Sequence, residues 1–248
     1  MNFFKPVALL LAVLTLLDAT PQKDVASTTE PAGGKIEGRI FFKGIPPEPE
    51  KIRVTKDAQI CGSSQMSEEF IVSPENKGLR NAVVMVLGAG ENPETITLNV
   101  EQTGCVYVPH VQVATVGSTL AVTNNDPTLH NVHATIVRDD NSKRTAFNVA
   151  QPAAKDPAKP SSIQKVLRRQ GVYWIECDVH PWMRSYVVVH DNNYYGRSDE
   201  SGYFTISDIP PGTYTVRIWH EGLGVVEKTV TVTEGQSATL DLPIEANE

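Results

Sequence analysis

Residues 177–183 read Cys-Asp-Val-His-Pro-Trp-Met and carry three potential metal-binding side chains in one short segment. The thiol of Cys177, the imidazole of His180 and the thioether of Met183 are spaced three residues apart. Apolar, strand-like runs stand on both sides of the segment. We therefore expect a loop between two adjacent strands, which would bring the three side chains close together.

A second imidazole is available from residues 126–133, which read Asp-Pro-Thr-Leu-His-Asn-Val-His and contain His130. Two His, one Cys and a weak axial Met form the ligand set of blue-copper electron-transfer sites. Structural zinc rarely takes a thioether, whereas calcium and magnesium prefer oxygen ligands. The two segments together therefore predict a mononuclear copper site.

Both segments resemble the cupredoxins, in particular the amicyanin-like and methylamine-utilisation-like members. The C-x-x-H-x-x-M spacing, the pair Pro181-Trp182, Arg184 and the run 187–189 match the ligand loop and last strand of that family. The resemblance covers residues 96–190. Carried over position by position, it implies the copper ligands His130, Cys177, His180 and Met183.

For three further polar residues, the sequence leaves the role at the predicted copper site undecided. The resemblance implies that Asn131 ties the His130 strand to the cysteine loop, and an ordinary turn residue is the alternative. His133 follows His130 by three positions, so in an extended strand the two rings point to opposite faces and rarely bind one metal. His110 has no evident counterpart in amicyanin-like chains, and it is either structural, a residue that orients a ligand, or an additional ligand.

Apolar residues flank the predicted ligands. Pro127 and Leu129 stand beside the first histidine, and Pro181 and Trp182 follow the second. If the ligand edges face solvent, these residues form an exposed apolar patch on which a redox protein partner could dock. Packing of the loops against each other is the alternative.

The chain has three cysteines, Cys61, Cys105 and Cys177. An exported protein meets an oxidising compartment in which thiols pair, and three pairings are possible here. Because a metal-bound thiolate is protected from pairing and Cys177 lies in the ligand segment, we predict a Cys61–Cys105 disulfide. Three unpaired, buried cysteines are the alternative.

The N-terminus has the pattern of a secretory signal, with Lys5 followed by an apolar run at 7–17. That run makes a helix of about 16 Å, too short for a bilayer core of about 30 Å. We assign residues 1–20 to a signal peptide and 21–34 to a flexible linker with few large apolar side chains. A periplasmic or extracellular location follows. A buried core helix and an uncleaved signal anchor, which would tie the chain to a membrane, are alternatives.

Strand signals dominate from residue 35 onward, because short alternating or β-branched runs are separated by Gly, Pro and Asn. This pattern predicts an all-β protein built from sandwiches. We expect strands at 35–42, 81–87, 95–100, 111–116, 119–123, 132–137, 172–176 and 186–190, and a loop at 150–160.

A second pattern begins after His190, where the turns Ser201-Gly202 and 210–212 separate alternating strands. It resembles the carboxypeptidase regulatory-like domain, a small transthyretin-like or immunoglobulin-like β-sandwich. The two opening strands that such a domain needs are found at 35–42 and 81–87, before the copper segment. We therefore expect a regulatory-like sandwich from residues 35–95 and 191–246, with a cupredoxin Greek-key sandwich of residues 96–190 inserted in it or joined to it.

The net charge of −7 and the absence of a Lys/Arg cluster argue against nucleic-acid binding. No Gly-x-Ser-x-Gly or His-Glu-x-x-His motif is present, so no hydrolase is indicated. We expect an exported type 1 copper protein that binds one copper ion per chain and carries single electrons without being an enzyme. The alternatives are a periplasmic copper-binding or delivery protein without redox turnover, and a structural β-sandwich with a non-functional copper motif.

Overall fold

The computed structural model describes residues 1, 32–90, 93–138, 140–154, 156 and 158–245. The predicted signal peptide beyond Met1 and most of the predicted linker, residues 2–31, lie outside the described residues. Gly34, the last residue of that linker, already pairs with Ile209 in a sheet. Among the described residues, no helix has the length and apolar character needed to cross a membrane.

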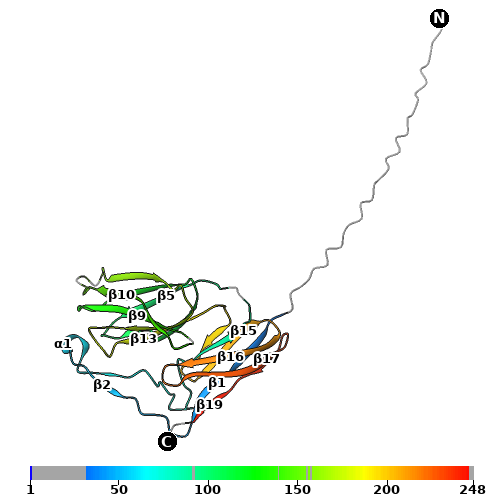
Figure 1. Cartoon of the computed structure of the whole chain (residues 1–248), viewed down its shortest axis with the longest axis horizontal. Coiled ribbons are helices and arrows are strands. Elements are labelled where there is room, and N and C mark those ends of the chain that lie inside the picture. The colour runs from blue at the N-terminus through cyan, green and yellow to red at the C-terminus, as the bar shows by residue number, and fades with distance from the viewer. Residues whose placement is uncertain (2–31, 91–92, 139, 155, 157, 246–248) are drawn as a thin grey trace. The chain divides into compact units, whose positions relative to one another are not determined.

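The described chain is almost entirely β-structure, which confirms the predicted fold class (Figure 1). Its elements are β1 (Gly34–Lys43), β2 (Lys51–Arg53), α1 (Ala58–Cys61), β3 (Ser64–Met66), β4 (Val83–Leu87), β5 (Thr97–Gln102), β6 (Tyr107–Val108), β7 (Val111–Thr115), β8 (Thr119–Asn124), β9 (His130–Val137), β10 (Lys143–Gln151), β11 (Ser161–Val166), β12 (Gly171–Glu176), β13 (Arg184–His190), β14 (Tyr195–Arg197), β15 (Tyr203–Ile209), β16 (Gly212–His220), β17 (Gly224–Val232), β18 (Ser237–Thr239) and β19 (Leu242–Glu245).

A first sandwich is built from the strands between Thr97 and His190. One sheet has the order β10-β9-β12-β13-β7, and the other has the order β11-β8-β5-β6. Alternate side chains of these strands point inward, as in β8, whose burial pattern alternates along its whole length. They form a first core that contains Cys177 and Met183 together with residues such as Tyr107 and Val132. Two of the predicted copper ligands therefore lie inside the core of this sandwich.

A second sandwich combines strands from both sides of that region. In one sheet β1 pairs with β15, β18 and β19, and the other sheet has the order β14-β4-β16-β17. Ile36 of β1 faces Ile206 of β15, and Val84 of β4 faces Ile218 of β16. These side chains belong to a second core, separate from the first. Strands that precede residue 97 thus share their sheets with strands that follow residue 190.

Gly38 of β1 is required for a steric reason. A Cβ atom added to Gly38 would lie 2.0 Å from the carbonyl oxygen of Leu240. Any other residue at this position would push β1 away from the chain segment between β18 and β19. The close approach of these backbones therefore requires glycine at residue 38.

The two sandwiches meet through a third apolar cluster within the compact unit Pro31–Glu248. Aromatic rings contact each other there, with the centroids of Tyr186 and Trp219 5.2 Å apart. Tyr186 comes from β13 of the first sandwich, and Trp219 comes from β16 of the second. The buried members of the cluster are Val83, Met85, Val111, Tyr186, Val188 and Trp219.

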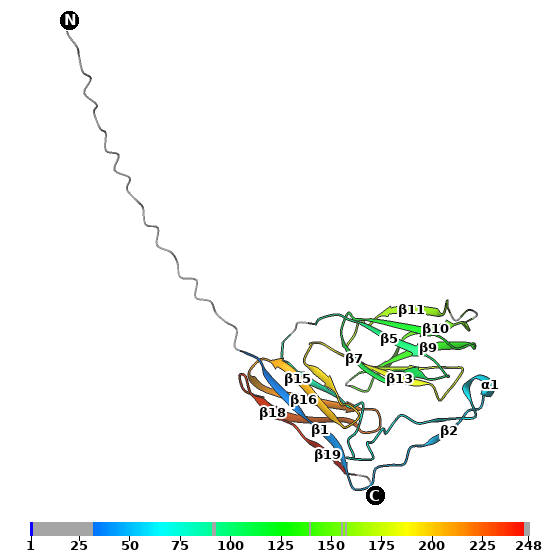
Figure 2. The same ribbon diagram turned by 180° about the vertical axis from the view of Figure 1, so that it is seen from behind.

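Residues 44–82 connect β1 to β4 and are here called the strap. The strap contains β2, α1 and β3, and Figures 1 and 2 both place α1 beside the first sandwich. Val54 and Cys61 of the strap are buried in the first core, whereas Phe70 packs against the second core. The strap therefore joins two strands of the second sandwich by way of the first sandwich.

Candidate metal centre

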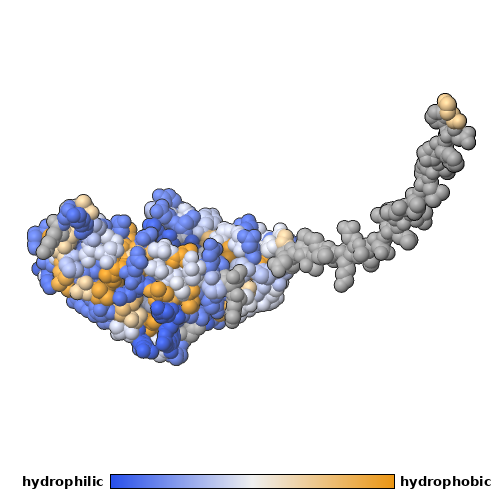
Figure 3. All heavy atoms as spheres, turned by 90° about the horizontal axis from the view of Figure 1, so that it is seen from above, coloured by the Kyte–Doolittle hydropathy of each residue, from blue (hydrophilic) through white to orange (hydrophobic). Residues whose placement is uncertain are grey.

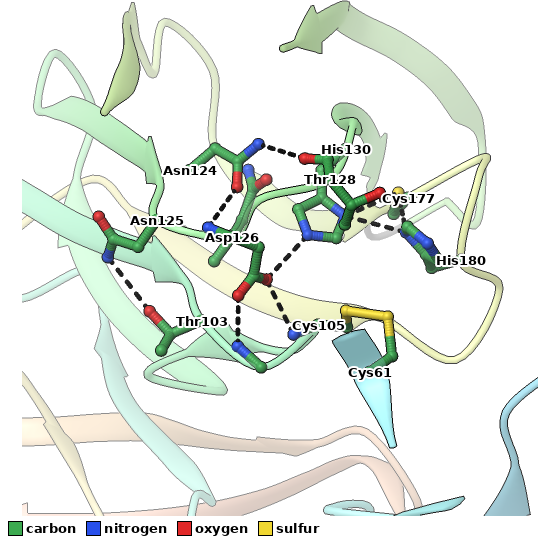
Figure 4. A network of polar contacts seen from close by, with 12 residues as sticks. Cys61, Thr103, Cys105, Asn124, Asn125, Asp126, Thr128, His130, Cys177 and His180 are labelled. Atoms are coloured by element: carbon green, nitrogen blue, oxygen red, sulfur yellow. Dashed lines mark hydrogen bonds and ion pairs between the residues drawn. A yellow bond between two sulfur atoms is a disulfide. The ribbon is translucent and has the colours of Figure 1, made fainter. Parts of the chain in front are cut away.

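Three of the predicted ligands meet in the first sandwich. His130 is the first residue of β9, Cys177 follows β12, and His180 lies in the loop that leads to β13. The Nδ1 atoms of His130 and His180 are 2.9 Å apart. The sulfur of Cys177 lies 3.7 Å from Nδ1 of His180 and 4.0 Å from Nδ1 of His130 (Figure 4). All three residues are buried, and their ligand atoms form one compact group.

The ligand loop is closed by backbone hydrogen bonds. The N–H of Cys177 donates to the carbonyl oxygen of Met183 at 3.3 Å, and the N–H of Met183 donates to that of His180 at 2.9 Å. Met183 is 1% exposed and belongs to the same apolar cluster as Cys177. These bonds fix the backbone from which the three predicted ligand side chains project, and they do not depend on a metal.

Each predicted ligand histidine is hydrogen-bonded to an aspartate through the ring nitrogen that faces away from the cluster. Nε2 of His130 donates to Asp126 at 2.9 Å, and Nε2 of His180 donates to Asp57 at 2.9 Å. An ionised carboxylate only accepts hydrogen bonds, so the Nε2 atoms carry the protons and this tautomer is inferred from the partners. Each Nδ1 atom then presents a lone pair to the other, and the pair requires a proton or a metal ion between them.

The spacing of the donor atoms fits a single metal ion. Metal–nitrogen bonds of about 2.0 Å and metal–sulfur bonds of about 2.3 Å place two ligand atoms about 3–4 Å apart. The separations in this cluster run from 2.9 to 4.0 Å. Two imidazole nitrogens and one sulfur in this arrangement suit zinc or copper, and a thioether in the same loop favours copper.

The protonation states of Cys177 and His180 are shifted toward those that bind metal, whereas that of His130 is shifted toward the protonated form. Burial raises the pKa of the Cys177 thiol, but hydrogen bonds from His130 and from nearby backbone N–H groups outweigh it and lower the pKa. Burial lowers the pKa of His180, and the partly compensating bond to Asp57 leaves it below its usual value. For His130 the effect of burial is outweighed by Asp126 and Cys177, so its pKa is raised. A thiolate beside a neutral His180 is the state that a metal needs.

Asn131 joins the histidine strand to the cysteine loop. Its side-chain oxygen accepts the backbone N–H of Asp178 at 2.7 Å, and its Nδ2 donates to the carboxylate of Asp178 at 2.9 Å. The same Nδ2 donates to Asn148 of β10 at 2.8 Å. This is the connection that the cupredoxin resemblance implies, and it fixes Cys177 relative to His130.

The structure brings neither His110 nor His133 into the cluster. The ring of His133 is bonded to Asp178 at 2.9 Å, and its side chain is 30% exposed on β9. Nδ1 of buried His110 donates to the carbonyl oxygen of Arg184 at 3.1 Å, and its Nε2 is bonded to Glu221. Burial lowers the pKa of His110, but the carboxylates of Glu221 and Glu68 outweigh it and raise the pKa.

The predicted disulfide between Cys61 and Cys105 is confirmed, and Cys177 is free and buried. The bond links α1 of the strap to the turn before β6. Backbone N–H groups of that turn donate to Asp126, from Gly104 at 2.7 Å and from Cys105 at 2.9 Å (Figure 4). Cys105 also lies near Asp126 and His130 in a second group of possible ligands, but its disulfide leaves it no thiolate to bind a metal.

The residues expected at a docking surface differ in exposure. Pro127 and Pro181 are exposed, and Leu129 is 46% exposed. Trp182 is half-buried, because its Nε1 donates to the carbonyl oxygen of Cys105 at 3.1 Å and its ring lies 5.1 Å from that of His180. On the face shown in Figure 3, apolar residues appear in small groups between polar ones.

A sequence model of the family described as "Polysaccharide lyase family 4, domain II" matches residues 167–240. This span begins before β12 and includes the ligand loop, but it covers less than half of the chain and does not assign the chain to that family. The carboxypeptidase regulatory-like resemblance stays a prediction. No curated protein sequence matches the chain.

Among solved structures, a purple cupredoxin from Nitrosopumilus maritimus is 24% identical over 37% of this chain and 98% of its own, with a TM-score of 0.30. The Cu(I) form of an amicyanin variant is 21% identical over 44% of this chain and 99% of its own, with a TM-score of 0.29. A copper-containing nitrite reductase from Thermus scotoductus is 18% identical over 41% of this chain and 24% of its own, with a TM-score of 0.29. Likenesses of this size support no conclusion about function.

Proposed function

We propose that this chain is a mononuclear copper protein that carries single electrons. The observation that carries the proposal is the pair of Nδ1 atoms of His130 and His180, 2.9 Å apart and both facing the sulfur of Cys177. Their other ring nitrogens are bound to carboxylates, so only these lone pairs remain for a metal. Met183, buried in the same loop, would supply a weak thioether ligand.

When bound, copper supplies a one-electron couple between Cu(II) and Cu(I). The protein's part is to hold the donors still while the charge changes. Asn131 fixes the cysteine loop to β9, and backbone hydrogen bonds close the loop between Cys177 and Met183. A site held from two sheet strands and a closed loop reorganises little, which favours fast electron exchange.

We propose a carrier and not an enzyme. A pocket of about 370 Å³ lies beside the ligand loop and is lined by Pro181, Trp182 and His110 among others, but by no member of the His130, Cys177 and His180 cluster. A substrate in this pocket would not contact the metal. This separation supports electron transfer through the protein.

Copper delivery is the second candidate, and burial argues against it. Passing an ion to a partner requires the partner's ligands to approach the metal. His130 and His180 are 0% exposed, Cys177 is 2% exposed and Met183 is 1% exposed. A structural module with a decayed motif is also disfavoured, because the donor atoms form one compact group.

The remaining functional expectations are proposals of the same kind. A redox protein would dock on the exposed residues Pro127, Leu129 and Pro181. Export to the periplasm or cell exterior is proposed from the N-terminal sequence, and membrane association would follow only from an uncleaved signal. We also propose that the cupredoxin-like sandwich is inserted in the second one, which the pairing of Ile36 with Ile206 supports.

Copper loading of the full chain tests the proposal. We expect one copper ion per chain, an intense visible thiolate-to-copper band, an EPR signal from Cu(II), and reversible one-electron reduction. Cys177→Ser should abolish the band while the fold persists. His133→Ala is the matched control, because it removes a nearby imidazole outside the cluster, and it should keep the band. A chain that binds no copper, or a Cys177→Ser variant that keeps the band, would overturn the proposal.

A further inference from the structure

The strap reaches the copper site through Asp57, although both of its ends lie in the second sandwich. Oδ2 of Asp57 accepts the Nε2 proton of His180 at 2.9 Å and the hydroxyl proton of Thr128 at 3.2 Å. The side chain of His180 is 0% exposed, and that of Asp57 is 26% exposed. The carboxylate therefore stands between the ligand imidazole and solvent.

The backbone of Asp57 is fixed by hydrogen bonds to α1 and by the disulfide at the end of that helix. Its carbonyl oxygen accepts the backbone N–H groups of Ile60 at 2.8 Å and Cys61 at 2.9 Å, which form the turn of α1. Its φ angle of 52° lies in the left-handed region, which aspartate tolerates better than most residues. Cys61 ends α1 and is bonded to Cys105. The carboxylate is thus held by a short turn with a covalent anchor.

The Cys61–Cys105 disulfide is also connected to His130, through Asp126. Cys105 donates its N–H to Asp126 at 2.9 Å, and Asp126 accepts the Nε2 proton of His130 at 2.9 Å. One disulfide therefore joins the strap segment that carries Asp57 to the turn whose backbone N–H groups bind Asp126. Because the strap is cross-linked to the first sandwich beside the site, the contact between Asp57 and His180 is held by a covalent bond close by.

We infer that Asp57 is a positioning residue for the metal centre: it closes the His180 edge to solvent and biases the bound copper toward the oxidised state. The inference rests on the proposed function. A carboxylate that accepts the Nε2–H of a ligand imidazole fixes its tautomer and strengthens its Nδ1 as a donor. Its negative charge also favours the metal state of higher charge.

Asp57 carries a negative charge at neutral pH, because aspartate carboxyls ordinarily titrate at about 3.9. Both hydrogen bonds to its Oδ2, from His180 and from Thr128, are accepted by the ionised carboxylate. Replacement by asparagine removes the charge and keeps the shape. Loss of such a ligand support lowers metal affinity about 10–100-fold, and Cu(II) should lose more than Cu(I) because it carries the higher charge.

The test is the midpoint potential of the copper-loaded full chain with and without the carboxylate. Asp57→Asn should bind Cu(II) about 10–100-fold more weakly, shift the midpoint potential upward and change the nitrogen hyperfine couplings in pulsed EPR. Asp178→Asn is the matched control. Its carboxylate follows Cys177 and is 53% exposed, but its side-chain partners are Asn131, His133 and Asn148. It removes the same charge without touching a ligand imidazole.

A potential in Asp57→Asn equal to that of the wild type, or shifted no more than in Asp178→Asn, would overturn the inference. If Asp57→Asn does not fold, Thr128→Val gives the same test with the opposite sign. It leaves the carboxylate with fewer competing donors, so the potential should fall, and an unchanged potential would overturn the inference. Absence of the thiolate band in the wild type would instead overturn the proposed function, so the two failures are distinguishable.

Discussion

The backbone N–H of Cys177 donates to the carbonyl oxygen of Met183 at 3.3 Å, so the first and last residues of the ligand loop are bonded to each other. This bond involves no side-chain atom. A side-chain substitution at Met183 therefore changes what the loop offers to a metal without opening the loop.

Met183→Leu should keep copper bound and raise its midpoint potential. Leucine has a similar volume, so the free energy of unfolding should fall by less than about 1.5 kcal/mol at this buried position. A weak axial thioether adjusts the potential more than it adds to affinity. Metal analysis and a redox titration check the prediction. Loss of all copper would show that Met183 is a principal ligand.

Removing the disulfide with Cys61→Ala and Cys105→Ala together should lower the free energy of unfolding by roughly 3–5 kcal/mol, as the chain-entropy model gives for a loop of this size. The two cysteines are 44 positions apart. Urea unfolding measures the loss, with reduced wild type as a second route to the same state. A loss under about 1 kcal/mol, or a peptide linking Cys177 to either cysteine, would contradict the prediction.

His110→Ala should leave the copper spectrum unchanged. The ring is bonded to Glu221 and to the carbonyl oxygen of Arg184, outside the ligand cluster. Its loss leaves buried acceptors without a donor, so we expect a destabilisation of about 1–3 kcal/mol. Absorption and EPR spectra of the loaded variant decide the question. A displaced band or altered copper hyperfine coupling would make His110 a ligand.

Stability should fall in mild acid because of His220. This residue is 2% exposed, and burial lowers its pKa to about 4, against the raising effect of the Glu221 carboxylate. Between the folded pKa and the ordinary value near 6.5, the unfolded chain binds a proton that the folded chain does not. The stabilisation from neutral His220 is therefore present at pH 7 and is lost as the pH falls toward 4.

The loss should amount to about 2 kcal/mol between pH 7 and pH 5. His220→Gln removes the titrating group and keeps a side-chain acceptor for the N–H of Gly222, which donates to Nδ1 of His220 at 3.2 Å. Urea unfolding of both proteins at the two pH values gives the comparison. Equal changes in the wild type and the variant would show that His220 does not cause the acid sensitivity.

The ligand cluster was predictable because its information is local. Cys177, His180 and Met183 lie in the one loop between β12 and β13. His130 is the first residue of β9, which neighbours β12 in the same sheet. Asp126 could have been found as well, since it stands four residues before His130 in the quoted segment. Asp57 could not, because it lies 123 positions from His180 and no spacing relates the two.

The elements missed from the sequence are short or exposed. α1 has four residues, and β2 and β3 have three each, too few for a period to be recognised. β10 is mostly exposed along its length, so its apolar alternation is weak. It extends to Gln151 and thus enters the segment 150–160 that was expected to be a loop, although the remaining described residues there are irregular.

The sequence before residues 96–190 also predicted two strands of the second sandwich. The alternation at 35–42 and the buried run at 81–87 predict strands, and these are β1 and β4. β1 pairs with β15 and β4 pairs with β16, so both share sheets with strands that follow the first sandwich. The parallel pairing of β1 with β18 and β19 has no local signal, because it depends on backbones that meet only after folding.

That pairing determines when each half of the protein can form during synthesis. Arg39 of β1 donates its N–H to Asp241, 202 positions later in the chain. One edge of β1 can pair with β15 once Ile209 has been made, but its pairing with β18 and β19 must wait for later residues, whereas every strand of the first sandwich is available once His190 has been made. A premature stop before residue 237 would leave one edge of β1 unpaired and prone to aggregate beside an already folded first sandwich.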